Sequence, residues 1–175
     1  MSEHQAGAGF SAGVITISDK SSRGERVDEG GRILRELVES LGGDVRTQVV
    51  VPDEADQIAQ AIRSMVDDQH LAAVFTTGGT GLAPRDVTPQ ATRSVIDFEV
   101  PGMAEAMRAA SLQKTPAAML SRALVGVRHR SLIVNLPGNP KGVRECLEVI
   151  APALGHAVET LGAHVGEHDR PIPLE

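Results

Sequence analysis

The sequence predicts a single α/β domain in which helices cover both faces of a mostly parallel central sheet. Between residues 12 and 75, short apolar segments rich in β-branched residues alternate with segments whose apolar residues have helical spacing. The connections between these predicted strands are long enough for right-handed crossovers, which join parallel strands. A chain of 175 residues with 41% hydrophobic content also fits one domain with a sizeable core.

The first strand and the first helix follow a small, polar start. We expect residues 1–12 to form a flexible tail and residues 13–162 to form the domain. The β-branched run from Ala12 to Ser18 predicts the first strand. After a polar loop, the segment from Gly30 to Leu41 predicts a helix that Gly42-Gly43 terminates. The apolar face of this helix contains Ile33, Leu34, Leu37, Val38 and Leu41.

The second strand, from Val45 to Val51, also leads into an amphipathic helix. Asp53 directly precedes this helix, and its side chain is expected to cap the helix N-terminus. Asp56 lies in the first turn, where a negative charge is favoured by the helix dipole. The buried stripe of the helix is predicted to be Ile58, Ile62, Met65 and Val66.

The third strand is followed by a cluster of glycines. The run from Leu71 to Phe75 is short and apolar, which is typical of a strand buried on both faces. In the next segment, Thr76 to Gly81, three of the last four residues have no side chain, so backbone N–H groups can approach an anion. A glycine cluster can equally form only a tight turn. Arg85 and Asp86 stand between two prolines, outside any helical pattern, and favour a ligand-binding loop.

The next part of the chain alternates short helices with turns. Thr88 is expected to cap a helix with Pro89 at its first position. Val100-Pro101-Gly102 is expected to break the chain before a helix from Met103 to Gln113. The segment from Ala117 to Arg122 fits either a loop contact or the end of a helix.

Two short strands and a long helix complete the predicted domain. The runs from Leu124 to Arg128 and from Leu132 to Leu136 predict a hairpin. The segment from Leu136 to Gly142 is rich in proline and glycine and is expected to form a rigid loop. Pro152 is expected to kink the last helix, and Cys146 is expected to be a small core residue rather than a nucleophile. The apolar face of that helix contains Val143, Cys146, Leu147, Ile150, Leu154, Val158 and Leu161.

Composition argues against several classes of partner. The net charge is 17 − 23 = −6 and the basic residues are dispersed, so no nucleic acid partner is expected. The apolar runs are too short to cross a bilayer and the start lacks a signal-peptide pattern, so we expect no membrane partner and a cytoplasmic location. A single cysteine fits a reducing compartment. Residues 163–175 are expected to form a flexible tail in which His164 and His168 are solvated rather than metal ligands.

Acidic residues lie in the loops that follow the three predicted parallel strands. These residues are Asp19, Asp53 and Asp86. Because parallel strands point in the same direction, the three loops are expected at one edge of the sheet, where open α/β folds bind ligands. The sequence therefore predicts a site that combines carboxylates with a glycine-rich anion loop.

Six motifs between Val14 and Leu161 resemble those of a known family. They are ISD (Ile17 to Asp19), VPDE (Val51 to Glu54), TTGGTGLAPRDVTP (Thr76 to Pro89), VPGMAEAMR (Val100 to Arg108), AAMLSR (Ala117 to Arg122) and LIVNLPGNPKG (Leu132 to Gly142). In sequence, order and spacing they resemble the molybdenum cofactor biosynthesis family, which includes bacterial molybdopterin adenylyltransferases and the N-terminal domain of gephyrin.

The resemblance implies a molybdopterin-binding fold, a homotrimer and an adenylyl transfer. In that reaction AMP passes from magnesium-ATP to the terminal phosphate of molybdopterin, and pyrophosphate is released. Asp53 and Asp86 are implied to be catalytic, with either or both binding Mg²⁺. The implied substrate-binding residues are Gly78, Gly79, Thr80 and Gly81 for the phosphate, Ser111 and Ser121 near the pterin, and Pro137, Gly138 and Asn139 for the nucleotide.

The resemblance also leaves a second function open. A close branch of the family lacks the Arg-Asp-Val-Thr-Pro run, which this chain retains at Arg85 to Pro89, and its retention favours the adenylylating branch. The alternative is a non-catalytic molybdopterin-binding or scaffold protein, in which apolar positions from Met103 to Met107 would form an interface. The resemblance also suggests a molybdenum-insertion enzyme as a partner.

Overall fold

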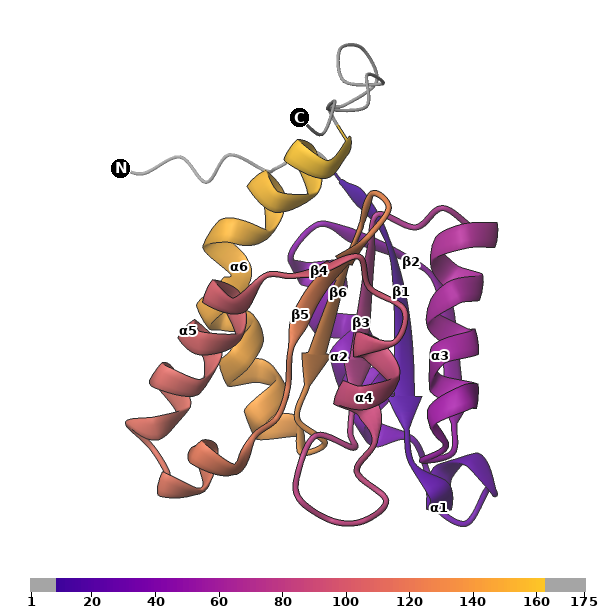
Figure 1. Ribbon diagram of the computed structural model, residues 1–175, viewed down its shortest axis with the longest axis vertical. Helices are drawn as coiled ribbons and strands as arrows, with labels where there is room; N and C mark the ends of the chain where they lie inside the picture. The colour runs from indigo at the N-terminus through magenta and orange to yellow at the C-terminus, as the bar shows by residue number, and fades with distance from the viewer. Residues whose placement is uncertain (1–8, 163–175) are drawn as a thin grey trace, which may run out of the picture.

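The computed structural model describes residues 9–162, which build a six-stranded sheet (Figure 1). The strands are β1 (Phe10–Ile17), β2 (Gly43–Val51), β3 (Ala73–Thr77), β4 (Phe98–Glu99), β5 (Val125–Arg128) and β6 (Ser131–Leu136). Their order across the sheet is β2-β1-β3-β6-β5-β4. The neighbours among β2, β1, β3 and β6 pair in parallel, whereas β5 pairs antiparallel with both β6 and β4. The predicted mostly parallel sheet and the predicted hairpin are therefore confirmed.

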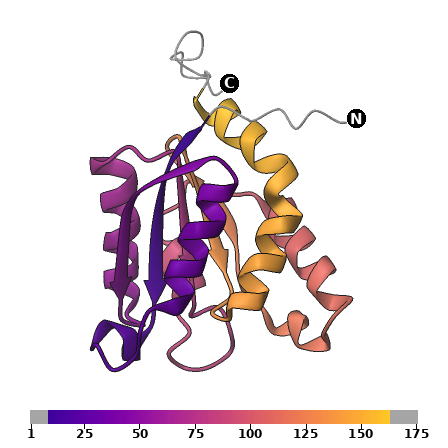
Figure 2. The same ribbon diagram turned by 180° about the vertical axis from the view of Figure 1, so that it is seen from behind.

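Helices cover both faces of the sheet, as predicted (Figures 1 and 2). One face packs against α2 (Glu29–Ser40), α5 (Pro101–Leu112) and α6 (Pro140–Gly162). The other face packs against α3 (Ala55–Arg63), its π-helical continuation η1 (Ser64–Asp68) and α4 (Thr88–Arg93). Two short elements, α1 (Asp19–Ser22) and the 3-10 helix η2 (Pro116–Leu120), lie in loops.

The alternation of side chains along the strands divides the core between the two faces. Val14 of β1 packs on the α2 and α6 face, whereas its neighbour Ile15 packs on the α3 face. Phe75 and Val74 of β3 divide in the same way, and all four side chains are completely buried. Burial on both faces explains why these strands are apolar throughout.

Some element boundaries differ from the prediction. β1 begins at Phe10, so residues 10–12 belong to the sheet and the expectation of a tail there was wrong. Phe10 is buried and its ring centroid lies 6.5 Å from that of Phe75. Pro101 begins α5 instead of separating it from the preceding strand, because proline is compatible with a first helical turn. β4 has only two residues, too few for any periodic signal.

The expected rigid loop from Leu136 to Gly142 is only partly a loop. Leu136 ends β6, and Pro140 already begins α6. Asn139 Oδ1 accepts a hydrogen bond from the Gly142 N–H at 2.7 Å, in the manner of a helix cap. Only residues 137–139 remain outside a strand or helix, so this connection is tighter than predicted.

Among residues 9–162, no helix combines the length and the apolar character needed to span a membrane. Residues 1–8 and 163–175, including His164 and His168, lie outside the described residues.

Candidate functional site

The carboxyl ends of the parallel strands bring the acidic loops together, as predicted (Figure 1). Asp19 follows β1 and Asp53 follows β2. The Asp19 N–H donates to Asp53 Oδ2 at 2.9 Å, and the Asp53 N–H donates to Asp19 Oδ1 at 3.0 Å. This reciprocal pair fixes both carboxylates to neighbouring backbones, so two acidic groups share a small, defined volume at the sheet edge.

Asp53 does not cap α3, and that prediction was wrong. The N-cap residue is Glu54, whose side chain makes no capping hydrogen bond. The Asp53 carboxylate instead receives the Asp19 N–H, a partner 34 positions away in the sequence. Burial raises the pKa of Asp53, and the negative charges of Asp19 and Asp86 raise it further. A cation at this point would relieve that unfavourable charge.

Arg85 supplies a positive charge that pairs with carboxylates of two of the acidic loops. Its Nε and Nη2 donate to the two carboxylate oxygens of Asp19 at 2.9 and 2.8 Å, and Nη2 also lies 2.9 Å from Glu54 Oε1. The hydrogen bonds from Arg85 lower the pKa of Asp19. Because the Arg85 side chain is 54% exposed, the pair adds little stability. Its effect is to hold the loop that contains Asp86 over the other two acidic loops.

The glycine loop has a backbone path that only glycine allows. Gly78 and Gly79 have φ angles of 104° and 66°. A Cβ at Gly78 would lie 2.4 Å from the Ile17 carbonyl oxygen, and one at Gly79 would lie 2.3 Å from Thr88 Oγ1. The glycines at these two positions are therefore required by the fold.

Thr88 holds this loop instead of capping α4. Its hydroxyl donates to the Gly78 carbonyl at 2.9 Å, and its N–H donates to the Gly79 carbonyl at 3.1 Å. Val87 occupies the N-cap position, so the predicted capping role of Thr88 was wrong. Two loop carbonyls are thereby turned towards the protein.

Both predicted catalytic aspartates flank the glycine loop. A Cβ at Gly79 would lie 3.3 Å from Asp53 Oδ1, and one at Gly81 would lie 2.8 Å from Asp86 Oδ2. Asp86 Oδ2 also accepts the Ala83 N–H at 2.9 Å. Within residues 9–162, no three side chains of His, Cys, Asp or Glu are grouped to hold a metal by themselves. Mg²⁺ usually takes one or two carboxylates and completes its shell with phosphates and water, and this pair of aspartates fits that pattern.

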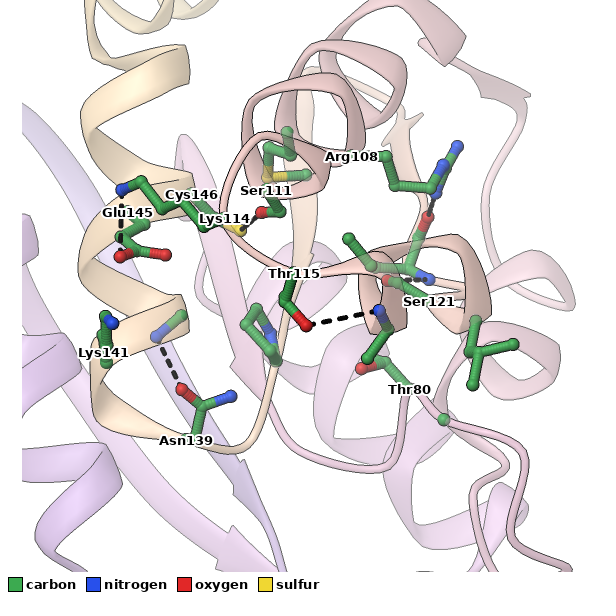
Figure 3. A pocket seen from close by; sticks show the side chains of 18 of the residues that line it. Thr80, Arg108, Ser111, Lys114, Thr115, Ser121, Asn139, Lys141, Glu145 and Cys146 are labelled. Atoms are coloured by element: carbon green, nitrogen blue, oxygen red, sulfur yellow. Dashed lines mark hydrogen bonds and ion pairs between the residues drawn. The ribbon is translucent and has the colours of Figure 1, made fainter.

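A cavity of about 350 Å³ lies beside the glycine loop (Figure 3). Its walls come from the loop, α5, η2, the start of α6 and the residues after β6. Six of the predicted site residues line it, namely Thr80, Gly81, Ser111, Ser121, Pro137 and Asn139. The other five predicted residues do not line this cavity, and these are Gly78, Gly79, Gly138, Asp53 and Asp86. Gly138 lies close to the glycine loop, since a Cβ there would lie 3.4 Å from the Gly78 Cα. The predicted residues thus form two groups that meet at Thr80 and Gly81.

Asn135 is a wall residue that the sequence pattern does not single out. Its side chain is completely buried, and its Nδ2 donates to the hydroxyls of Thr76 and Thr92 at 3.0 Å each. Its Oδ1 has no hydrogen-bond partner among residues 9–162. Leaving a buried oxygen unpaired is costly, and the enclosed Asn135 Oδ1 carries that cost in this strand. The only sequence signal is one polar residue inside an otherwise apolar strand.

Cys146 is buried in the core, as predicted, and also lines the cavity. Burial raises the pKa of its thiol, and the Ser111 Oγ lies 4.0 Å from its Sγ. A thiol with a raised pKa is a poor nucleophile. Cys146 therefore serves as a small wall residue.

Comparison with known families agrees with this arrangement. A family model described as a probable molybdopterin binding domain matches residues 13–156. This chain belongs to that molybdopterin-binding family.

Several relatives match most of the chain. The molybdopterin adenylyltransferase of Helicobacter pylori strain J99 is 42% identical over 151 residues, covering 85% of this chain and 86% of that protein. The enzyme of that name from Escherichia coli K12 is 43% identical, covering 83% and 76%. The Drosophila melanogaster molybdenum cofactor synthesis protein cinnamon is 44% identical over 87% of this chain, which spans only 26% of that longer protein.

Solved structures of the same fold carry two different protein names. The molybdopterin biosynthesis enzyme MoaB from Thermus thermophilus has a TM-score of 0.83 and 49% identity, covering 88% of this chain and 97% of that one. The molybdopterin biosynthesis Mog protein from Mycobacterium ulcerans has a TM-score of 0.82 and 40% identity, covering 87% and 99%.

Proposed function

We propose that this chain is a molybdopterin adenylyltransferase of molybdenum cofactor biosynthesis. Relatives of that name from several bacteria are 42–43% identical over most of the chain. The observation that carries the proposal is the glycine loop, which has Asp53 and Asp86 beside it and a ligand-sized cavity at its Thr80-Gly81 end. This layout places an acidic group of residues next to a cavity suited to a heterocycle.

The cavity is proposed to hold the pterin of molybdopterin. Its walls combine apolar groups with the polar side chains of Ser111 and Ser121. Such a mixture of apolar surface and a few fixed polar groups is typical of small-molecule sites. The N–H groups of Gly79, Thr80 and Gly81 are proposed to hold the terminal phosphate, and Gly78 shapes the loop with its own N–H donated to the Leu136 carbonyl at 3.2 Å.

The acidic edge is proposed to hold the nucleotide, with Asp53 and Asp86 holding Mg²⁺. In the transfer, an oxygen of the molybdopterin phosphate bonds to the α-phosphorus of ATP, and pyrophosphate leaves with the electrons of the broken P–O bond. When bound, the metal supplies positive charge that offsets repulsion between the reacting phosphates. The protein contributes positioning, which is the main source of catalysis when both reactants are anions. The loop from Pro137 to Asn139 is proposed to contact the nucleotide, and Gly138 already packs against Gly78.

The assembly and location of the protein are further parts of this proposal. A homotrimer in the cytoplasm and a molybdenum-inserting partner rest on the family resemblance. Phe98 on the edge strand β4 is 56% exposed and offers an apolar contact for a second subunit. Met107, in contrast, is 3% exposed within its own chain, so it needs no interface to explain it. Light scattering of the purified protein tests the trimer, and a monomeric mass would contradict it.

The proposed reaction is tested by measuring pyrophosphate release from magnesium-ATP with and without molybdopterin. We expect release that requires molybdopterin and is lost in Asp53→Ala and Asp86→Ala. If the wild-type protein binds molybdopterin but releases no pyrophosphate, the non-catalytic binding or scaffold function takes the place of the enzyme.

A further inference from the structure

Arg122 is bonded to the backbone of the glycine loop and to that of Asp86. Its N–H donates to the Thr80 carbonyl at 2.9 Å, and its Nε donates to the Gly81 carbonyl at 2.7 Å. Its Nη2 donates to the Asp86 carbonyl at 2.5 Å. One half-buried residue therefore connects the two ends of the exposed turn from Leu82 to Arg85, in addition to the bonds that Thr88 makes to Gly78 and Gly79.

These bonds also orient the peptide groups of the loop. In a trans peptide the C=O and the following N–H point in opposite directions, and no cis peptide occurs among residues 9–162. Holding the Thr80 and Gly81 carbonyls towards Arg122 directs the next two N–H groups away from it. Hydrogen bonds from a charged donor are also stronger than those between neutral groups. Arg122 thus fixes which side of the loop can receive an anion.

The position of Arg122 in the chain joins this support to the cavity. Ser121, directly before it, lines the cavity, and η2 forms part of the same wall. On the other side, the Ala123 carbonyl accepts a hydrogen bond from Arg108 Nη1 at 2.7 Å. Because the Ser121 N–H donates to the Ala118 carbonyl at 3.2 Å, the segment from Ser121 to Ala123 is held at both ends while the Arg122 side chain reaches Asp86.

We propose that Arg122 is a positioning residue that keeps Asp86 and the glycine loop in register with the pterin cavity. The proposal rests on the adenylyl transfer described above. Arg122 acts through the Gly81 and Asp86 carbonyls, and its guanidinium has no role as an acid, a base or a metal ligand. Its loss should affect the metal-binding aspartate and the transfer step more than the binding of molybdopterin.

Arg128, the last residue of β5, provides a matched control. The turn between β5 and β6 lies at the end of the sheet opposite the loop that follows β3 (Figure 1). Arg128 is also half-buried, and its Nη1 donates to the Val95 carbonyl at 2.8 Å. Its remaining donors bond to Asp67 at 2.8 and 2.6 Å. Removing either arginine should cost comparable stability, but only Arg122 lies beside the proposed site.

The first test compares Arg122→Gln, Arg122→Lys and Arg128→Gln in pyrophosphate release. We expect Arg122→Gln to lower kcat about 100-fold, the effect typical of a misplacement near 1 Å. The KM for molybdopterin should rise by a smaller factor than kcat falls, because the contacts of the pterin in the cavity remain although the loop that holds the phosphate is loosened. The magnesium concentration at half-maximal rate should rise. Arg122→Lys should recover part of kcat, since it keeps the charge but not the forked donors. Arg128→Gln should change none of these three quantities, namely kcat, KM and the magnesium concentration at half-maximal rate.

The second test does not depend on turnover. Amide hydrogen exchange of residues 80–87 should accelerate about tenfold or more in Arg122→Gln, with little change in β1 and β6. Arg128→Gln should leave residues 80–87 unchanged. An inactive wild-type protein with this exchange pattern would overturn the proposed reaction and leave the positioning role standing. An active wild-type protein with unchanged exchange, or a raised KM at unchanged kcat, would overturn the positioning role alone.

Discussion

Gly78→Ala is expected to destabilise the fold strongly, and the structure gives the size of the effect. The φ of Gly78 is 104°, and strained backbone of this kind costs about 1–3 kcal/mol for a residue with a Cβ. The new Cβ would lie 2.4 Å from the Ile17 carbonyl oxygen, a backbone atom of β1 that cannot rotate away. Overpacking costs about another 1–3 kcal/mol, giving a loss of about 2–6 kcal/mol in total.

A matched substitution within the same protein isolates this effect. Gly155 lies in the exposed part of α6, and a Cβ there would meet nothing within 4 Å. Gly155→Ala should therefore stabilise the protein by about 0.5–1 kcal/mol, because alanine favours helix. The free energies of unfolding are measured by urea denaturation followed by circular dichroism. For a typical domain the total is about 5–15 kcal/mol, so Gly78→Ala should shift the midpoint clearly.

The two variants also separate stability from function. Gly78→Ala should lose molybdopterin-dependent pyrophosphate release even at a temperature where it is fully folded, while Gly155→Ala should keep it. Equal unfolding midpoints for the two variants would refute the described path of the loop. Full turnover by folded Gly78→Ala would refute the phosphate-binding role of that path.

Three further predictions follow from the titratable groups. Because the folded state raises the pKa of Asp53, this carboxyl favours folding at low pH and loses that contribution as pH rises through its folded pKa. Asp53→Asn should therefore unfold at a higher urea concentration than the wild type at pH 7, with a smaller difference at pH 3, and should lack turnover; a lower midpoint at pH 7 would contradict this. Arg85 lowers the pKa of Asp19, so that Asp19 favours folding above its unfolded pKa and loses this contribution as pH falls through its folded pKa. Arg85→Gln should raise the Asp19 pKa in a carboxyl NMR titration, and an unchanged value would show that Arg85 is not its main partner. Cys146 is buried with a raised pKa, so alkylation at pH 7.5 should be slow in the native protein and fast in urea; fast native alkylation would place the thiol in solvent.

The fold was predictable because it depends on local periodicity. The buried β-branched strands and the amphipathic helices each carry their signal within a few residues. Strand direction then followed from the crossovers, and with it the meeting of Asp19, Asp53 and Asp86 at one edge. These inferences need no knowledge of side-chain partners.

The predictions of the two helix-capping residues were wrong for the opposite reason, because they depended on partners far away in the sequence. Asp53 and Thr88 both have good capping residue types and positions, but their side chains bond to Asp19 and Gly78 instead. The competing partners are 34 and 10 positions away in the sequence, outside the range of any capping rule. At both positions a bond that builds the candidate site replaces a bond that would only end a helix.

Arg122 and Asn135 were outside the reach of sequence patterns as well. Arg122 lies in a segment that fitted either a loop or a helix end, and its partners Gly81 and Asp86 are 41 and 36 positions away. Asn135 joins β6 to Thr76 and Thr92 across 59 and 43 positions. Such bonds become visible only when the parallel strands have been placed side by side.

The acidic edge and the cavity differ in charge. At the edge, Arg85 pairs with Asp19 and Glu54, while the charges of Asp19 and Asp86 act together on Asp53. A triphosphate would meet net repulsion there unless a cation accompanied it. If this edge holds the nucleotide as proposed, its negative charges lead us to expect that nucleotide binding depends on magnesium.

The cavity has the opposite balance. Lys114, Lys141 and Arg108 line it together with Glu145, which pairs with Lys114 at 2.9 Å. An anionic heterocycle can enter this side without a metal. The glycine loop lies at the boundary between the two regions, because Gly81 lines the cavity while also lying next to Asp86. The difference in charge supports the proposed placement of each substrate on its own side of the loop, with the reacting phosphate at the boundary where the two sides meet.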